Sequence, residues 1–377
     1  MATVDRHPGR ALTGALALLA AALVLGVVLG PRTGTPVGAD GSAREPGLPV
    51  GVSFGERLTR ASPAELATAL DDVVALGARW VRLDVSWPTI QPVSADQHDW
   101  AALDRVVAEA QQRDLDVLGV VTWSAPWVRD PGCTTFTCPP ASAASYAVFA
   151  GEVAQRYRGR IAAYEIWNEP NLDLFWVAPD PRRYRELLTG ATLALQQGDP
   201  DAQVLMGGLA ANDRREGVVD AGDFLRVACS GGACRGLDGV AYHPYTYPRT
   251  PTDPAVETPW QRMTRSTRQG PALDGLMSAA GIDPSALWVT EYGAPTGGAS
   301  TDGSPTGAVD EAQQARILAA GVRAAAAAPQ VRALMLYTWR DLETGGTVED
   351  HFGLRRLDGS QKPAWEAVRR AVADTSG

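Results

Sequence analysis

The 377-residue sequence predicts an α/β protein, a (β/α)8 TIM barrel that forms a single catalytic domain after an N-terminal apolar segment. From residue 49 onward, short apolar runs rich in β-branched residues alternate with longer amphipathic stretches. Eight such pairs follow one another without a low-complexity break, and none of the runs leads into GxGxxG or a GxxxxGKS-type phosphate loop. These observations favour one closed barrel over residues 49–377 rather than an open nucleotide-binding sheet.

The expected strands are short and apolar, and each is followed by one expected helix. The strands are Val50–Phe54, Trp80–Val85, Val117–Thr122, Ala162–Trp167, Gln203–Gly207, Gly239–His243, Leu287–Thr290 and Ala333–Tyr337. The helices are Pro63–Leu76, Trp100–Arg113, Ala143–Tyr157, Pro181–Gln197, Val219–Ala228, Trp260–Ala280, Val309–Ala328 and Lys362–Val372. Pro63 and Pro181 stand in first turns, where proline is tolerated, and Ser62 is placed to cap the first helix.

The N-terminal region indicates export. Residues 1–10 are basic, and the uncharged segment 11–30 is long enough to cross a bilayer as a helix. It exceeds the usual apolar core of a cleaved signal peptide, so we favour a signal anchor over a signal peptide, with 37–39 as the candidate cleavage site. Residues 31–48, rich in Gly and Pro, are expected to form a flexible linker. The barrel should then be extracytoplasmic, either membrane-anchored or secreted.

Charge and cysteine content narrow the classes of partner. A net charge of -9 disfavours nucleic acid, whose binding depends on clustered Lys and Arg. Two close cysteine pairs, Cys133 with Cys138 and Cys229 with Cys234, predict two local disulfides in an exported protein. The four histidines are scattered and the cysteine spacing is not that of a zinc site, so no metal and no cofactor are expected. Membrane contact is expected only through the N-terminal segment.

Two glutamates stand where the reactive groups of a barrel gather. The segment WNEPN (167–171) ends the fourth predicted strand, and TEYG (290–293) ends the seventh. Active sites of such barrels lie at the carboxyl ends of the strands, so Glu169 and Glu291 should face each other across the mouth. Glycosidic bond cleavage requires such a carboxylate pair, and a separation of about 5 to 5.5 Å gives retention of configuration.

The two motifs together resemble those of clan A glycoside hydrolases, in which the acid/base is the Glu of an Asn-Glu-Pro segment after strand four and the nucleophile a Glu ending strand seven. The resemblance runs from about residue 49 to 372 and is nearest to family 39-like or family 5-like cellulase sequences, because WNEPNLDLFW is followed by an HPY segment. It implies a barrel in which Glu169 is the acid/base and Glu291 the nucleophile.

The same resemblance implies further site residues. Asn168 should hydrogen-bond the sugar 2-hydroxyl near the nucleophile. His243 and Tyr245, in the HPY segment, should line the cleaved subsite and orient the nucleophile. Trp339, in YTWRD after the last strand, should form the aromatic platform under the sugar.

Arg82 and several tryptophans are further candidates. Arg82, on strand two, could keep Glu291 ionised or could form a buried ion pair with Asp84, and the sequence leaves both open. Glu165 lies lower on the fourth strand and reads as an interior structural group. Tryptophans just past the predicted strands could stack on sugar rings or pack in the core, and their number favours stacking for several of them. They are Trp87, Trp123, Trp127, Trp176 and Trp339.

The expected function is that of a retaining glycoside hydrolase, which cleaves O-glycosidic bonds of an extracytoplasmic polysaccharide or oligosaccharide by double displacement. A transglycosylase would need identical residues, because an acceptor sugar then replaces water. A non-catalytic carbohydrate-binding barrel is a third alternative, and would be expected to have lost one carboxylate. The glycan, the linkage and the oligomeric state do not follow from the sequence.

Overall fold

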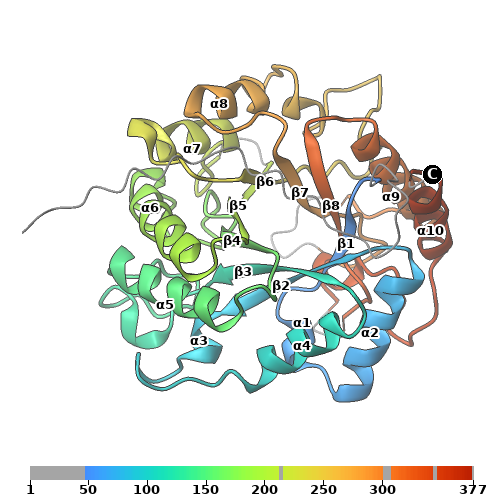
Figure 1. Cartoon of the computed structure of the whole chain (residues 1–377). Helices are drawn as coiled ribbons and strands as arrows, with labels where there is room; N and C mark the ends of the chain where they lie inside the picture. Colours follow the sequence, from blue (N-terminus) through green and yellow to red (C-terminus); the bar gives the residue numbers. More distant parts are fainter. Residues whose placement is uncertain (1–46, 212–214, 300–306, 343–345, 376–377) are drawn as a thin grey trace, which may run out of the picture. The chain divides into compact units, whose positions relative to one another are not determined.

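The fold is a closed eight-stranded parallel barrel, which confirms the predicted (β/α)8 architecture. The computed structural model describes residues 47–211, 215–299, 307–342 and 346–375. Each strand is hydrogen-bonded to the next, and β8 closes on β1. Figure 1 shows the helices arranged around the outside of this ring. The predictions for 1–10, 11–30 and nearly all of 31–48 lie outside the described residues.

The elements follow the predicted order. The strands are β1 (Val50–Ser53), β2 (Trp80–Ser86), β3 (Asp116–Thr122), β4 (Ala163–Asn168), β5 (Gln203–Ala210), β6 (Gly239–His243), β7 (Leu287–Tyr292) and β8 (Val331–Tyr337). The α-helices are α1 (Arg57–Arg60), α2 (Pro63–Ala75), α3 (Trp87–Ile90), α4 (Ala101–Gln111), α5 (Ala143–Arg156), α6 (Pro181–Gly198), α7 (Ala221–Ala228), α8 (Leu273–Ala280), α9 (Glu311–Ala326) and α10 (Pro363–Thr375).

Helix starts follow the local sequence. The Ser62 hydroxyl accepts from the Glu65 backbone N–H at 3.2 Å, and Pro63 occupies the first turn of α2. Asp180 caps α6 in the same way ahead of Pro181. These caps fix where the chain leaves the barrel mouth and turns back along its outside.

Helix α8 is much shorter than predicted. A helix was expected over 260–280, but α8 begins only at Leu273. Gly270 has φ +145°, a conformation that favours glycine, and Pro271 disfavours helical geometry in the residue before it. The segment before α8 is therefore a loop with a short 3-10 turn, η3 (Gln261–Met263), and part of it lines a pocket together with Tyr245.

The barrel interior is apolar at the bottom and charged above. A small cluster of buried side chains, distinct from the main core between strands and helices, fills the lower part; it comprises Leu118, Ala163, Leu205, Trp288, Ala333 and Met335. Above it lie Arg82, which is 1% exposed, and Glu165, which is fully buried. Side chains of alternate strand residues face the interior, so Arg82 continues the Trp80 face of β2 and Glu165 the Ala163 face of β4. The charged layer therefore forms the floor of the mouth.

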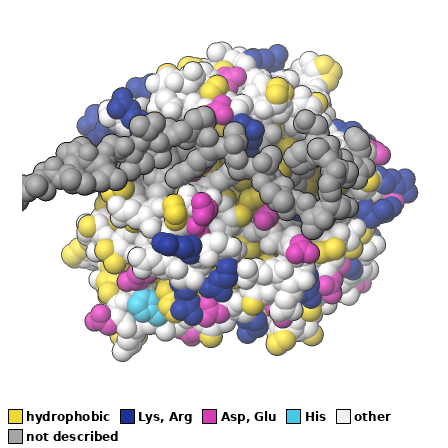
Figure 2. All heavy atoms as spheres, in the orientation of Figure 1, with side chains coloured by type: hydrophobic (Ala, Val, Ile, Leu, Met, Phe, Trp, Pro, Cys, Tyr) yellow, Lys and Arg dark blue, Asp and Glu magenta, His cyan; other side chains and the backbone are white. Residues whose placement is uncertain are grey.

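Both predicted disulfides are present. Cys133 bonds to Cys138 in the loop after β3, and Cys229 bonds to Cys234 between α7 and β6. On the face in Figure 2, acidic and basic side chains are interspersed rather than gathered by sign. Within the described part of the chain, no helix combines the length and the hydrophobicity that membrane crossing requires.

Candidate active site

The backbone at the end of β4 turns Glu169 into the barrel mouth. Trp167 and Glu169 both have positive φ, at 69° and 43°, which is uncommon for residues with side chains. The Glu169 N–H donates to the Gly208 carbonyl of β5 at 2.9 Å, which holds this turn in place. Such strain is found where neighbouring structure fixes a functional side chain, and Glu169 is 8% exposed.

An irregularity at the end of β7 brings Glu291 to the same place. The register of β7 against β8 shifts between Val289 and Tyr292. Tyr292 packs outside the barrel against Trp260, with ring centroids 5.3 Å apart. Glu291 turns inward, where its Oε1 accepts from Arg82 Nη1 at 2.5 Å and its Oε2 accepts from the Tyr245 hydroxyl at 2.8 Å.

His243, at the end of β6, bridges the two glutamates. Its Nδ1 lies 2.7 Å from Glu169 Oε1 and 3.7 Å from Glu291 Oε2, and its Nε2 lies 3.0 Å from the Thr290 hydroxyl. One nitrogen of His243 and one oxygen of each glutamate all lie within 4.8 Å of one another. The predicted residues Glu169, Glu291, His243 and Tyr245 thus meet in one cluster, in which Glu169 and His243 are buried and Glu291 and Tyr245 half-buried.

The environment moves the two carboxyl pKa values in opposite directions. Burial is the largest influence on both and favours the neutral acid. At Glu169 burial prevails over the hydrogen bond from His243, so the pKa is raised. At Glu291 burial is outweighed by His243, Arg82 and the Tyr245 hydroxyl, so the pKa is lowered. One member of the pair therefore retains a proton at a pH where the other is ionised.

Arg82 contacts Glu165 and Glu291 rather than forming the alternative ion pair with Asp84. Its Nε and Nη2 donate to the two oxygens of Glu165 at 2.9 and 3.1 Å. Its Nη2 also donates to Asn168 Oδ1 at 2.8 Å, so the amide of Asn168 presents its Nδ2 donors elsewhere. Glu165 accepts in addition from the Gly208 N–H, as an interior structural group would. Arg82 thereby links the end of β4 to Glu291 on β7.

Glu169, His243 and Glu291 are also residue types that bind metals, and they are close enough to share an ion. Both oxygens of Glu291 already accept hydrogen bonds, one of them from a guanidinium. A cation at this position would lie against the positive charge of Arg82. The donor set thus suits a carboxylate pair, with Glu291 held by Arg82 and Glu169 by His243, better than a metal centre.

Two of the predicted sugar-stacking tryptophans are core residues instead. Trp87 is fully buried, stacks on Phe149 with centroids 5.1 Å apart, and donates through Nε1 to Gln91. Trp176 is 1% exposed and packs edge-on against Trp167. Both lie between the barrel and its helices, which corrects the prediction that they bind substrate. Trp127 is 38% exposed, and its Nε1 donates to the Gln91 carbonyl.

Trp339 also lies away from the mouth, and this corrects its prediction as the platform. It is 2% exposed, and its Nε1 donates to Asp72 Oδ2 of α2 at 2.7 Å.

Tyr337, the last residue of β8, takes the inward position because it continues the face of Met335. Burial and the charges of Glu291, Glu349, Asp84 and Glu169 all raise the Tyr337 pKa, which places the phenol among these carboxyls.

Trp123 directly follows β3, at the carboxyl end of the strand. It has φ 67° at the end of β3, and its Nε1 donates to Asp84 Oδ2 at 3.1 Å. The half-exposed ring of Phe136 packs edge-on against it, with centroids 5.0 Å apart. Trp123 is 7% exposed, and its stacking on a sugar stays a prediction.

Two further acidic residues at the mouth were not predicted. Burial raises the pKa of Asp84 to about 7, with Glu56 and Glu291 adding to it, while Arg82 and Trp123 oppose the shift. Burial and Glu291 raise the pKa of Glu349 to about 7 as well. Asp84 shares the inward face of β2 with Arg82, so strand alternation carried a signal for it. Glu349 comes from the loop after β8, for which alternation gives no guide.

Several solved structures similar to this barrel are glycoside hydrolases. A family 39 glycoside hydrolase from Bacteroides cellulosilyticus WH2 matches with TM-score 0.66 and 19% identity over 89% of this chain and 65% of that one. A GH39 enzyme from Xanthomonas axonopodis pv. citri matches with TM-score 0.63 and 17% identity over 87% and 68%. A β-xylosidase from Caulobacter crescentus CB15 matches with TM-score 0.58 and 19% identity over 85% and 67%.

The chain thus spans 65% of the length of the Bacteroides enzyme. No family model and no curated protein sequence matches the chain. Similarity at this level of identity establishes the common barrel fold, and function is argued from the site.

Proposed function

We propose that the protein is a retaining glycoside hydrolase that acts on an extracytoplasmic polysaccharide or oligosaccharide. The observation that carries this proposal is the pair Glu169 and Glu291, which share His243 within 4.8 Å and have oppositely shifted pKa values. The solved glycoside hydrolases of the same fold support a carbohydrate substrate. The two disulfides are consistent with an extracytoplasmic site of action.

In the first step, ionised Glu291 attacks the anomeric carbon while protonated Glu169 donates its proton to the leaving oxygen. The glycosidic carbon–oxygen bond breaks, and a glycosyl ester forms on Glu291. The close approach of the two carboxyls favours this route, because an inverting enzyme needs room for a water between them. The Asn168 amide, whose oxygen is held by Arg82, donates to the neighbouring sugar hydroxyl.

In the second step Glu169, now a carboxylate, accepts a proton from water as the water attacks the ester. The ester bond to Glu291 breaks, and the sugar leaves with its original configuration. His243 and Tyr245 hold the two carboxyls in place, and Tyr337 and Trp123 form the wall against the sugar. An acceptor sugar in place of water would give transglycosylation with the same groups.

The test uses a panel of aryl glycosides and polysaccharides with the wild type, Glu169→Ala and Glu291→Ala. Each substitution should lower kcat/KM by about 10³-fold. Added azide should rescue both variants with different products, because it intercepts the glycosyl ester in Glu169→Ala but attacks the substrate directly in Glu291→Ala. We expect a glycosyl azide of retained configuration from the first and of inverted configuration from the second.

Full activity in either variant would overturn the assignment of that glutamate. Wild-type sugar binding without turnover on the whole panel would favour the non-catalytic barrel. A product distribution dominated by longer oligosaccharides would favour transglycosylation.

A further inference from the structure

We propose that a side pocket over the loop after β6 is a subsite for uncharged sugar units beyond the cleaved bond, so that the substrate is an extended chain and not a single terminal sugar. This inference rests on the proposed function for its choice of ligand. It depends on where the pocket begins, on its size and on the pairing of the charges that line it.

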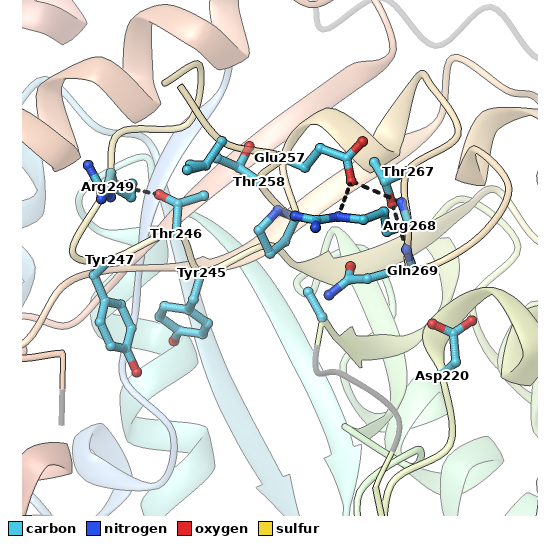
Figure 3. A pocket seen from close by; sticks show the side chains of 13 residues that line it. Asp220, Tyr245, Thr246, Tyr247, Arg249, Glu257, Thr258, Thr267, Arg268 and Gln269 are labelled. Carbon is cyan, nitrogen blue, oxygen red and sulfur yellow. Dashed lines mark hydrogen bonds and ion pairs between the residues drawn. The ribbon is translucent and has the colours of Figure 1, made fainter. Parts of the chain in front are cut away.

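The pocket begins at a residue of the catalytic cluster. Tyr245 donates its hydroxyl to Glu291, and the same residue lines a cavity of about 730 Å³. Tyr245 and Tyr247 are partly exposed and pack edge-on, with ring centroids 5.9 Å apart. In Figure 3 they lie on one side of the pocket, with Arg268 and Gln269 across from them. A sugar bound here would be separated from Glu291 by about the length of the Tyr245 side chain.

The volume of the cavity suits a ligand larger than one sugar unit. Binding pockets for small molecules have volumes of about 300 to 1,000 Å³. The far wall is the loop that replaces the first half of the expected helix, because Gly270 and Pro271 end helical geometry there. A helix over 260–280 would remove the loop in which Thr267, Arg268 and Gln269 reach the pocket.

The charges that line the pocket are paired, which suits hydroxyl groups better than an ionic sugar. Arg268 lies 3.4 Å from Glu257, and Arg249 lies 3.5 Å from Asp253. Asp220 accepts two hydrogen bonds from the guanidinium of Arg262, which packs behind the pocket. The charged lining residues, two acidic and two basic, therefore carry no net charge. The side chains of Arg268 and Arg249 are 89% and 56% exposed, so their free N–H groups can reach a ligand.

The experiment measures how affinity depends on chain length. The full-length Glu169→Gln protein is titrated calorimetrically with xylo-, manno- and cello-oligosaccharides, from the monosaccharide upward. We expect affinity for one series to rise by about tenfold as units are added, and Arg249→Ala with Arg268→Ala to abolish that rise. Val256→Trp, which fills the pocket from an exposed position, should do the same.

Arg265→Ala is the matched control, because Arg265 is an exposed arginine of the same loop that does not line the pocket. It should leave the rise intact. Equal affinity for all lengths, no binding of any series, or an equal loss in the control would overturn the subsite.

Turnover by the wild type separates this proposal from the proposed function. Length-dependent binding without hydrolysis would retain the subsite and reject the hydrolase. Hydrolysis of aryl monoglycosides without length-dependent binding would retain the hydrolase and reject the subsite.

Discussion

Arg82 Nη1 lies 2.5 Å from Glu291 Oε1, while the other nitrogens of the guanidinium are held by Glu165. The planar fork of arginine allows these contacts together, since each uses a different N–H direction. Glu165 is itself fixed by the Gly208 N–H of β5 at 2.6 Å. His243 has the largest lowering influence on the Glu291 pKa and Arg82 the next, and the Arg82 charge is thus anchored to the barrel wall.

Arg82→Lys should therefore weaken catalysis by changing the protonation of Glu291. A lysine ammonium cannot bind both oxygens of Glu165 and still reach Glu291 in this geometry. We expect kcat/KM to fall by about 100-fold, and its acidic limb to move to higher pH because part of the lowering influence on Glu291 is lost. The measurement is the pH profile of kcat/KM, which reports the free enzyme.

Arg355→Lys provides the control. Arg355 donates through two nitrogens to Asp72 outside the mouth, at 2.5 and 2.6 Å. This variant should lower the melting temperature without moving the acidic limb. An unchanged limb in Arg82→Lys would contradict the role given to Arg82.

Asp84 should make the protein less stable as the pH rises. Its pKa is raised to about 7 in the folded state, against an ordinary value of about 4 in the unfolded chain. Between these values the native state binds a proton that the unfolded state does not, so the free energy of unfolding falls with rising pH. Asp84→Asn should lessen that fall by about 1 kcal/mol or more between pH 4 and 7, measured by urea unfolding.

Asp104 offers the opposite case on the outside of the barrel. Its hydrogen bond from Arg156 lowers its pKa, so its contribution to stability is lost as the pH falls through the folded-state value. Asp104→Asn should therefore lower stability at neutral pH, reduce the further loss on acidification, and leave the slope of stability with pH in the neutral range unchanged. An identical effect of the two variants on the pH slope would refute the assignment for Asp84.

Tyr337 and Trp339 should separate activity from stability. Trp339→Leu removes a buried ring and leaves Asp72 with one donor fewer, so we expect a loss of about 3 kcal/mol in the free energy of unfolding with KM unchanged. Tyr337→Leu should raise KM about tenfold with a smaller loss of stability, because its ring is only partly buried. Denaturant unfolding and steady-state kinetics measure both. A raised KM in Trp339→Leu alone would restore the original platform prediction.

Sequence periodicity was sufficient for the barrel and for the two glutamates, because both depend on local patterns. Eight apolar runs fix the order of the strands, and the residues that end them must lie at one edge. The direction of a side chain after a strand ends is a different problem. Trp339 keeps the parity of Tyr337 in sequence, yet it lies beyond the end of β8 and packs on α2.

Other parts of the site depend on contacts between distant segments. Asp84 of β2 and Glu349 of the loop after β8 both raise the pKa of Tyr337 on β8, and nothing in the spacing of these residues signals that influence. The side pocket exists because the chain before α8 is a loop, and an amphipathic pattern over 260–280 hid that loop. A greater weight for Gly270 followed by Pro271 would have divided this segment correctly.

The two disulfides should differ in their effect on activity although they close loops of equal length. Each joins cysteines five residues apart, so removal of either should cost about 2 kcal/mol of unfolding free energy by loop entropy. The Cys133–Cys138 loop follows β3 at the mouth, whereas Cys229–Cys234 leads into the start of β6 at the opposite end. Only the first can therefore disturb the site.

The expected route of that disturbance runs through Phe136, which lies between Cys133 and Cys138 and packs on Trp123. Trp123 in turn donates to Asp84. The double variant Cys133→Ser, Cys138→Ser should raise KM several-fold. Phe136→Ala should reproduce this rise with both disulfides intact. The double variant Cys229→Ser, Cys234→Ser should leave KM unchanged. An equal KM in the two double variants would mean that the loop after β3 does not stabilise the site. The position of Trp123 would then depend on the barrel alone.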